Sequence, residues 1–377
     1  MIACEPSGDQ LGALLMRGLR AECPEVELIG LGGPLMEGEG LKTLFDVREL
    51  ALNGVFEVLP KAPMVLRRVR ETLKDIEAKS PDVLVTIDSW GFTGRIHERL
   101  TDKGSTIPRV RCVAPQVWAW RPGRAKQLAR WINHLLTLLP FEPPYFTKYG
   151  LPATWIGHPV LESGFGGGNG AIFRAINRIP AERRVIAVLP GSRHSEVSRL
   201  LPVFKDAVAL LAERIPELHV VMPTVSTVAA EVEADAATWR VPVTVVTRED
   251  QRRDAIAAAE VALAASGTVS LELAMAGVPH IIAYRTHPLT GLLLRLFIRT
   301  RFVNLINILV DHEAVPERLL GRCRADILAD DVGLLLRDET RRVAQRADFA
   351  AALKRLSPEG ELPSRRGART ILSLVKG

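Results

Sequence analysis

The sequence predicts two doubly wound α/β domains, each with a parallel sheet covered by helices on both faces. The chain has 377 residues, which is more than one ordinary hydrophobic core accommodates, so two domains are expected. Short apolar segments rich in β-branched residues alternate with helical patterns along the chain, and this alternation is typical of parallel sheets. The glycine-rich segment 163–170, SGFGGGNG, predicts a flexible connection between two similar halves.

Eight segments have the composition of buried strands. In chain order they are Val83–Ile87, Arg109–Val113, Leu135–Leu139, Val185–Leu189, His219–Met222, Val243–Val246, Val261–Ala265 and His280–Tyr284. Only about four residues precede the first loop, so either the first strand is very short or the true start lies upstream.

Three parts of the chain are therefore expected: an N-terminal domain (1–165), a C-terminal domain (166–335) and a charged helical tail (336–377) that could pack back on the N-terminal domain. Two doubly wound domains that face each other form a cleft at the carboxyl ends of their strands, where ligands bind as a rule.

Composition narrows the class of protein. Hydrophobic residues make up 47% and charged residues 24%, with a net charge of +6. This balance is typical of a globular protein, allows an anionic partner, and lacks the clustered basic excess of a nucleic-acid reader. The four cysteines show no CxxC pair, so neither a zinc site nor a disulfide framework is expected. No signal peptide and no run of 18 apolar residues is apparent, which indicates a cytoplasmic protein that does not span a bilayer.

Two glycine-containing loops in the C-terminal half predict a diphosphate site. In the first, Gly191, Ser192 and Arg193 follow a strand and open a helical pattern. Glycine lets the backbone approach a ligand, a helix N-terminus offers free N–H groups, and arginine provides a forked cationic donor for phosphate oxygens. In the second, Ser266, Gly267 and Thr268 stand in the same position, with Glu272 one turn further on. Each loop alone could be an ordinary capped turn; two in one domain favour a nucleotide diphosphate, with Glu272 accepting from ribose hydroxyls.

Two features of the N-terminal half are candidates for activating and binding a second substrate. Asp88 follows the strand Val83–Ile87, where a carboxylate is either a general base or a helix cap. The segment 115–124, PQVWAWRPGR, brings two tryptophans and two arginines together just past a strand. That combination suits stacking on a sugar or binding of an anionic acceptor, although the tryptophans could equally pack in the core.

Taken together, these segments resemble lipid-A-disaccharide synthases. The resemblance rests on pieces in order along the chain: EPSGDQLGA (5–13), GLGGPLMEGEG (30–40), ELALNGVFEVLP (49–60), APQVWAWRPGR (114–124), LLPFEPPYFTKYGLPATWIGHPV (138–160), LPGSRHSEV (189–197), ASGTVSLE (265–272), AYRTHPLT (283–290) and NLINILVDHEAVPE (304–317). It implies two Rossmann-like domains of the GT-B type. It also implies transfer of a 2,3-diacylglucosaminyl group from its UDP donor to 2,3-diacylglucosamine 1-phosphate, with inversion and release of UDP. No metal or other cofactor is expected, because the helix dipoles and Arg193 would stabilise the departing UDP.

The resemblance also assigns residues. Asp88 and Arg193 would be catalytic, and Asn307 would join the two loops and Glu272 in binding UDP. The acceptor side would comprise Glu5, Ser7, Asp9, Gln116, Trp118, Arg121 and His158. The chain departs from the family pattern at Ser89-Trp90-Gly91, where a proline and a second acid are expected, and at Ala114, Ile306 and Leu320.

Acylated substrates imply a membrane surface. We expect peripheral association with the cytoplasmic face of the inner membrane through Phe56, Val58, Leu59, Val65 and Leu66, which precede Arg67, Arg68 and Arg70. A second candidate is 292–301, where leucines, Phe297 and Ile298 are interleaved with arginines; either segment could instead be a buried amphipathic helix. A homo-oligomer is possible. The alternatives are another UDP-sugar enzyme of the same fold, such as a cell-wall glycosyltransferase or an epimerase, or an inactive lipid- or nucleotide-binding relative.

Overall fold

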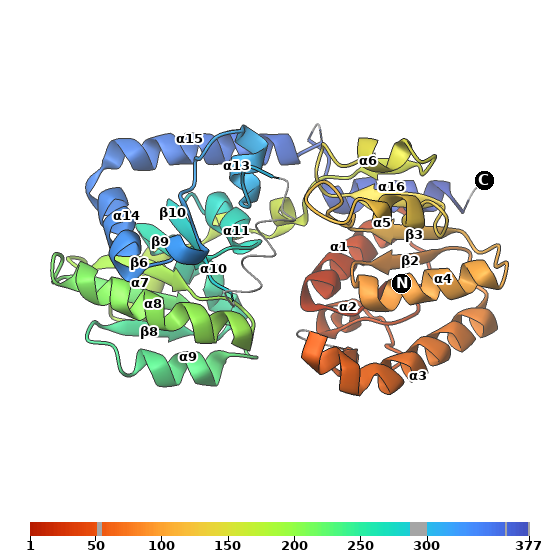
Figure 1. Cartoon of the computed structure of the whole chain (residues 1–377), viewed down its shortest axis with the longest axis horizontal. Helices are drawn as coiled ribbons and strands as arrows, with labels where there is room; N and C mark the ends of the chain where they lie inside the picture. Colours follow the sequence, from red (N-terminus) through yellow and green to blue (C-terminus); the bar gives the residue numbers. More distant parts are fainter. Residues whose placement is uncertain (51–54, 287–299, 359, 376–377) are drawn as a thin grey trace. The chain divides into compact units, whose positions relative to one another are not determined.

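A computed structural model describes residues 1–50, 55–286, 300–358 and 360–375, with the backbone alone for 55–61 (Figure 1). The chain divides into two compact units. Unit 1 comprises Met1–Glu162 and Leu356–Gly377, and unit 2 comprises Ser163–Arg355. The C-terminal segment thus divides at Leu356 instead of staying together from 336 onward.

Unit 1 contains a parallel sheet of five strands in the order β1-β2-β3-β4-β5. The strands are β1 (Ile2–Ala3), β2 (Leu84–Ile87), β3 (Arg109–Cys112), β4 (His134–Thr137) and β5 (Ala153–Trp155). An isolated parallel bridge from Ile2 to Leu31 continues the sheet on the far side of β1. After β1 the chain forms the Leu31 bridge on one side of that strand and then returns to form β2 on its other side. The direction of winding therefore reverses between β1 and β2, which is where ligands usually bind in such sheets.

The helices of unit 1 cover this sheet with apolar faces. They are α1 (Pro6–Glu22), α2 (Pro34–Gly38), α3 (Val55–Lys79), α4 (Trp90–Asp102), α5 (Gly123–Leu128), α6 (Pro144–Thr147) and α16 (Pro363–Ser373). Helix α16 lies beside α1 (Figure 1). Gly18 allows this packing, because a Cβ atom there would stand 2.4 Å from the carbonyl oxygen of Ser364.

Unit 2 contains a parallel sheet of six strands in the order β11-β10-β9-β6-β7-β8. The strands are β6 (Arg184–Leu189), β7 (Leu218–Pro223), β8 (Val243–Val246), β9 (Val261–Ala265), β10 (His280–Tyr284) and β11 (Glu317–Leu319). The chain runs outward from β6 to β8 and then returns to β9 on the other side of β6. The point of reversal therefore lies between β6 and β9, where doubly wound sheets bind ligands.

The helices of unit 2 pack their apolar faces against this sheet. They are α7 (Gly170–Ile176), α8 (His194–Ala212), α9 (Ala229–Ala236), α10 (Glu249–Ala257), α11 (Val269–Met275), α13 (Leu305–Val310), α14 (Ala325–Arg337) and α15 (Glu339–Leu356). The predicted flexible segment 163–170 packs against this unit: Phe165 is buried, and Gly170 lies where a Cβ atom would stand 2.4 Å from the carbonyl oxygen of Ala257. Gly168 and Gly170 thus serve close packing, which sequence composition alone does not distinguish from flexibility.

Candidate active site

The first loop of unit 2 connects β6 to α8 and is shaped by Glu196. Gly191 has φ +120°, a conformation that favours glycine, and a Cβ atom there would stand 2.6 Å from the Glu196 carboxylate. The Ser192 N–H donates to Glu196 Oε2 at 3.1 Å. Arg193 donates through Nη1 to Glu196 Oε1 at 3.0 Å, yet its side chain stays 56% exposed. The loop therefore presents a pre-positioned guanidinium at the start of a 19-residue helix.

The second loop, Ser266–Thr268, connects β9 to α11 and lies next to the first. Strands β6 and β9 are paired, with Leu189 opposite Ala264, so both loops leave the same edge of the sheet at its point of reversal. Gly267 and Thr268 are exposed and Ser266 is half-buried. Unit 2 thus brings together the residues that the sequence predicted for a diphosphate.

Glu272 is placed near these loops but already has a partner. Its Oε2 accepts from Nη2 of Arg252 at 2.6 Å, and the Arg252 guanidinium lies 5.4 Å from the ring centroid of Phe165. Burial raises the pKa of Glu272, and the charge of Arg252 opposes that rise. Sequence reasoning missed Arg252, because nothing in its local pattern indicates a contact with a glutamate on another helix.

Asn307 does not fit the predicted role of a direct UDP contact. Its side chain is fully buried, its Oδ1 accepts from the Val315 N–H, and its Nδ2 donates to the Val315 carbonyl and to Glu317 Oε1. Asn307 therefore holds the start of β11 in place, and its amide has no remaining donor for a ligand.

Asp88 lies at the carboxyl end of β2, in an unusual backbone conformation. Asp88 and Ser89 both have left-handed φ angles, 48° and 49°, and Val113 at the end of the adjacent strand β3 has φ 75°. A β-branched residue in this region is a true outlier, and such strain accumulates at functional sites. Thr93 Oγ1 donates to the carbonyl oxygens of Asp88 at 2.7 Å and Ser89 at 3.0 Å, which fixes the turn.

Arg111 supports the same turn from inside the sheet. Its side chain is 1% exposed; Nε donates to the Val113 carbonyl, Nη1 donates to Thr93 Oγ1 at 2.8 Å, and Nη2 stands 3.7 Å from Asp88 Oδ1. Burial lowers the pKa of Arg111 to about 10, and the Asp88 charge opposes that shift. A buried arginine needs partners of this kind, and Asp88 keeps 42% of its side chain exposed. Asp88 is thus an accessible carboxylate beside a buried cation.

The loop after β1 adds one partner to this turn. Glu5 Oε1 accepts from Ser89 Oγ at 3.0 Å, so the ends of β1 and β2 are joined. Ser7 is exposed in the first turn of α1. Asp9, predicted for the acceptor side, has a different role: it is buried, and its carboxylate accepts from the N–H groups of Gly33, Leu35 and Met36. It caps α2, and this engagement removes it from direct acceptor binding.

The loop after β3 carries Gln116, Trp118 and Arg121. Gln116 and Arg121 are exposed, and Arg121 has φ 49°. Trp118 donates through Nε1 to Glu142 Oε1 at 3.3 Å, and Glu142 Oε2 accepts from the Leu139 N–H at 3.0 Å. Burial raises the pKa of Glu142 to about 7. Sequence reasoning missed Glu142, which ties the Trp118 loop to the loop after β4.

His158 is part of the scaffold and does not face a ligand. It is buried, and its ring Nδ1 accepts from the Val160 N–H at 3.2 Å. The backbone N–H of His158 donates to the Leu356 carbonyl. Burial lowers its pKa to about 4, so the ring is neutral near pH 7. The predicted acceptor role of His158 is therefore corrected to one of joining the segment after β5 to the returning C-terminal segment.

Of the predicted membrane-facing residues on α3, only Val65 and Leu66 have described side chains, and the two differ in burial. Val65 is buried with Val69, Leu73 and Ile76 in the core of unit 1, so its assignment to the surface is wrong. Leu66 is 38% exposed. The side chains of Phe56, Val58 and Leu59 lie outside the described residues, as does 287–299, which includes most of the second candidate segment.

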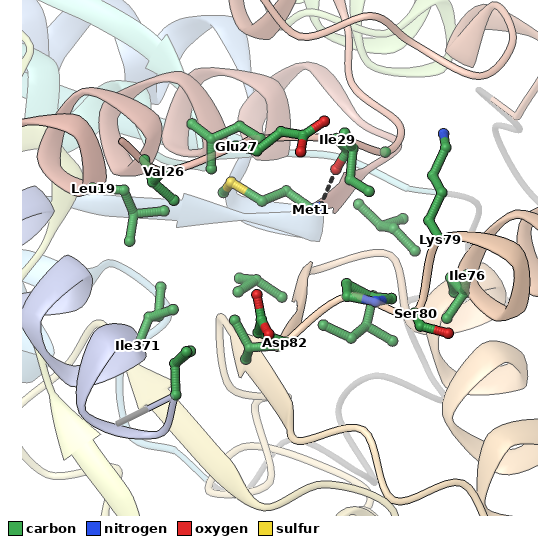
Figure 2. A pocket seen from close by; sticks show the side chains of 18 of the residues that line it. Met1, Leu19, Val26, Glu27, Ile29, Ile76, Lys79, Ser80, Asp82 and Ile371 are labelled. Atoms are coloured by element: carbon green, nitrogen blue, oxygen red, sulfur yellow. Dashed lines mark hydrogen bonds between the residues drawn. The ribbon is translucent and has the colours of Figure 1, made fainter. Parts of the chain in front are cut away.

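A cavity of about 440 Å³ in unit 1 lies away from Asp88. It is lined by Met1 and by residues at the beginning of β2, whereas Asp88 follows the end of β2. Figure 2 shows Leu19, Val26 and Ile371 around it, with the Met1 amino group donating to the Ile29 carbonyl. This cavity therefore lies at the amino ends of the strands, whereas the predicted site lies at their carboxyl ends.

Two negative findings apply to the described part of the chain. No helix in it combines the length and apolar character needed to cross a bilayer. No group of three or more His, Cys, Asp or Glu side chains in it is arranged to hold a metal ion.

Solved structures with the same fold show that the predicted pair of doubly wound α/β domains is correct. An S. aureus MnaA–UDP co-structure matches with a TM-score of 0.67 at 12% identity, covering 99% of this chain and 93% of that one. A. baumannii MurG matches with a TM-score of 0.54 at 14% identity, covering 97% and 96%. At these identities the likeness concerns the fold alone.

Sequence relatives are more specific. The lipid-A-disaccharide synthase of Paramagnetospirillum magneticum is 48% identical over 379 residues, covering 100% of this chain and 97% of the relative. That of Rhodospirillum centenum is 47% identical over 377 residues, covering 100% and 94%. The family model for lipid-A-disaccharide synthetase matches residues 1–369. The chain belongs to the lipid-A-disaccharide synthetase family.

Proposed function

We propose that this protein transfers a 2,3-diacylglucosaminyl group from UDP-2,3-diacylglucosamine to 2,3-diacylglucosamine 1-phosphate, which gives lipid A disaccharide 1-phosphate and UDP. The observation that carries the proposal is the family match over residues 1–369. The paired loops at the reversal point of unit 2 and the exposed Asp88 carboxylate in unit 1 supply groups suited to the two halves of this reaction.

Each group has a distinct task in this mechanism. The diphosphate of UDP binds at the two loops, where N–H groups at the start of α8 and the Arg193 guanidinium face the charge that grows as UDP departs. The primary hydroxyl of the acceptor attacks the anomeric carbon from the opposite side. Its oxygen forms the new glycosidic bond, the bond from carbon to the UDP oxygen breaks, and the hydroxyl proton passes to the Asp88 carboxylate.

Turnover of both substrates tests the function. The purified protein is expected to form disaccharide phosphate and UDP in equal amounts, only when donor and acceptor are both present. Conversion of the UDP-sugar to an epimer without acceptor would instead identify a sugar-nucleotide epimerase. Tight UDP binding with no product from either substrate would identify a binding protein.

For membrane association we propose an exposed stripe of α3 as the docking surface, here called the α3 stripe. It consists of Leu66, Arg67, Arg70 and Lys74, which are all exposed, whereas Val65, Val69 and Leu73 of the same helix are buried. Arg68, between them in sequence, is not available because Glu49 and Glu71 pair with it. Among the residues whose side chains are described, Arg67, Arg70 and Lys74 form no salt bridge. An apolar residue beside such cations suits the boundary of an anionic bilayer.

Replacing Arg67, Arg70 and Lys74 together by glutamine is expected to weaken binding to anionic vesicles on the order of 100-fold, since each cation contributes about 1 kcal/mol near such a surface. Co-sedimentation with phosphatidylglycerol vesicles at low salt measures the effect. A control with Arg99, Arg178 and Arg240, which are exposed elsewhere, loses the same charge and should bind normally. Equal weakening in both triple variants would show that net charge, and not the α3 stripe, attracts the membrane.

A further inference from the structure

Four side chains of unit 1 form an alternating arrangement of rings and cations, here called the tryptophan–arginine stack: Trp90, Trp120, Arg121 and Arg124. The Arg121 guanidinium lies 4.5 Å from the ring centroid of Trp120. The Arg124 guanidinium lies 4.6 Å from the ring centroid of Trp90 and 5.4 Å from that of Trp120. Cation–π contacts hold guanidinium groups in fixed orientations while leaving their N–H donors free in the plane.

The two cations of the stack have no anionic partner among the described residues. In the described parts of the chain, neither Arg121 nor Arg124 forms a salt bridge, and each is paired only with indole rings. Burial lowers the pKa of Arg124, and the charge of Arg121 lowers it further. For Arg68, by contrast, carboxylate partners raise the pKa. Two neighbouring cations without a counter-ion repel each other, and a bound anion would remove that cost.

The stack reaches the turn that carries Asp88. Trp90 follows Asp88 by two positions, and its ring also lies 5.4 Å from the Arg111 guanidinium. Arg111 in turn stands 3.7 Å from Asp88 Oδ1. One continuous series of contacts therefore connects the proposed base, the half-buried Arg124 and the exposed Arg121.

We infer that the tryptophan–arginine stack binds the anomeric phosphate monoester of the acceptor sugar. This inference rests on the proposed function. In that acceptor, the phosphate on C1 and the hydroxymethyl group on C5 are attached to the two carbons that flank the ring oxygen. A dianion at Arg121 and Arg124 would therefore place the primary hydroxyl toward Asp88, while the exposed part of Trp120 contacts the sugar ring. Forked guanidinium donors match phosphate oxygens, and indole rings match the apolar face of a sugar.

The test compares two acceptors, one with the 1-phosphate and one without it. In a double variant with Arg121→Ala and Arg124→Ala, kcat/KM for the phosphorylated acceptor is expected to fall about 100-fold, mainly through KM, because two charge-assisted contacts are lost. For the acceptor without phosphate it should fall much less, since no phosphate is present to bind and only the support of the indole rings is lost. The matched control is Arg99→Ala with Arg130→Ala, two exposed residues of the same unit.

Binding without turnover provides the second measurement. Tryptophan fluorescence of the wild type should change saturably with glucosamine 1-phosphate and much less with glucosamine, and the double variant should lose this difference. An equal fall of kcat/KM for both acceptors, or unchanged binding of glucosamine 1-phosphate by the double variant, would overturn the inference. So would loss of binding to phosphatidylglycerol vesicles with acceptor discrimination intact, because the stack would then contact lipid headgroups.

The two proposals can fail separately. A wild-type protein that forms no disaccharide refutes the proposed function, and the glucosamine 1-phosphate titration still decides whether the stack binds a sugar phosphate. A wild type that forms disaccharide while the double variant keeps its preference for the phosphorylated acceptor refutes the phosphate site alone.

Discussion

Replacement of Arg193 by alanine is expected to lower kcat on the order of 100-fold or more. Arg193 is the exposed guanidinium at the start of α8, where its pairing with Glu196 orients it beside Gly191. The negative charge on the diphosphate increases as the bond to the sugar breaks, so this contact strengthens in the transition state and removing it raises the barrier by about 3 kcal/mol. Initial rates at saturating substrates measure the effect.

Two variants make the result specific. Arg199→Ala removes another exposed arginine from α8 and should leave kcat nearly unchanged. Arg193→Lys keeps the charge without the forked geometry, and its kcat should lie between the values for Arg193→Ala and Arg199→Ala. Near-normal turnover by the Arg193→Ala protein, with its thermal melt unchanged, would show that UDP leaves without help from this side chain.

Asp88→Asn is expected to retain less than a tenth of wild-type kcat, because general-base catalysis usually contributes about 10²–10⁴-fold. Asparagine tolerates the left-handed backbone that this position has, with φ 48°, so the turn should persist. The amide has no site for the hydroxyl proton. Steady-state rates with both substrates, together with UDP affinity measured separately, show whether chemistry alone is lost.

Asp88→Ala is the poorer variant, because alanine fits the left-handed conformation less well and also removes the side-chain oxygen that lies 3.7 Å from the buried Arg111 guanidinium. If the asparagine variant turns over at more than a tenth of the wild-type rate, another group accepts the proton. Glu5, joined to Ser89 on the same turn, would be the next residue to replace.

The central strands were predictable because their burial is continuous. β9 and β10 begin and end where the sequence predicts, and β2, β3 and β6 differ by one residue at one end. β8 also has its predicted bounds although it is a half-buried edge strand, because its sequence VTVV consists of β-branched residues. The strands that sequence reasoning missed are short edge strands. β5 and β11 are only half-buried, with the sequences ATW and ERL, so they lack the apolar pattern that identifies a central strand.

The site was predictable where function depends on local sequence, and not where it depends on distant partners. A strand, a glycine and a helix start are adjacent in sequence, so the Gly191 and Gly267 loops could be identified. Arg111 and Glu142 form their contacts across strands and loops. The available signal for Arg111 was a charge between the apolar residues Val110 and Cys112 of a strand, since such a charge needs a partner when it is buried. Helical periodicity on α3 would similarly have placed Val65 with Val69 and Leu73.

The cavity beside Met1 has a practical consequence for separating the two units. Met1 and Val375, close to the two ends of the chain, line the same cavity, so a short linker could join the ends. A circular permutant that starts at Ser163, continues through the linker into Met1 and stops at Glu162 would make each unit one uninterrupted stretch. The two stretches could then be produced as separate polypeptides, on which nucleotide affinity and sugar-phosphate affinity could be measured independently.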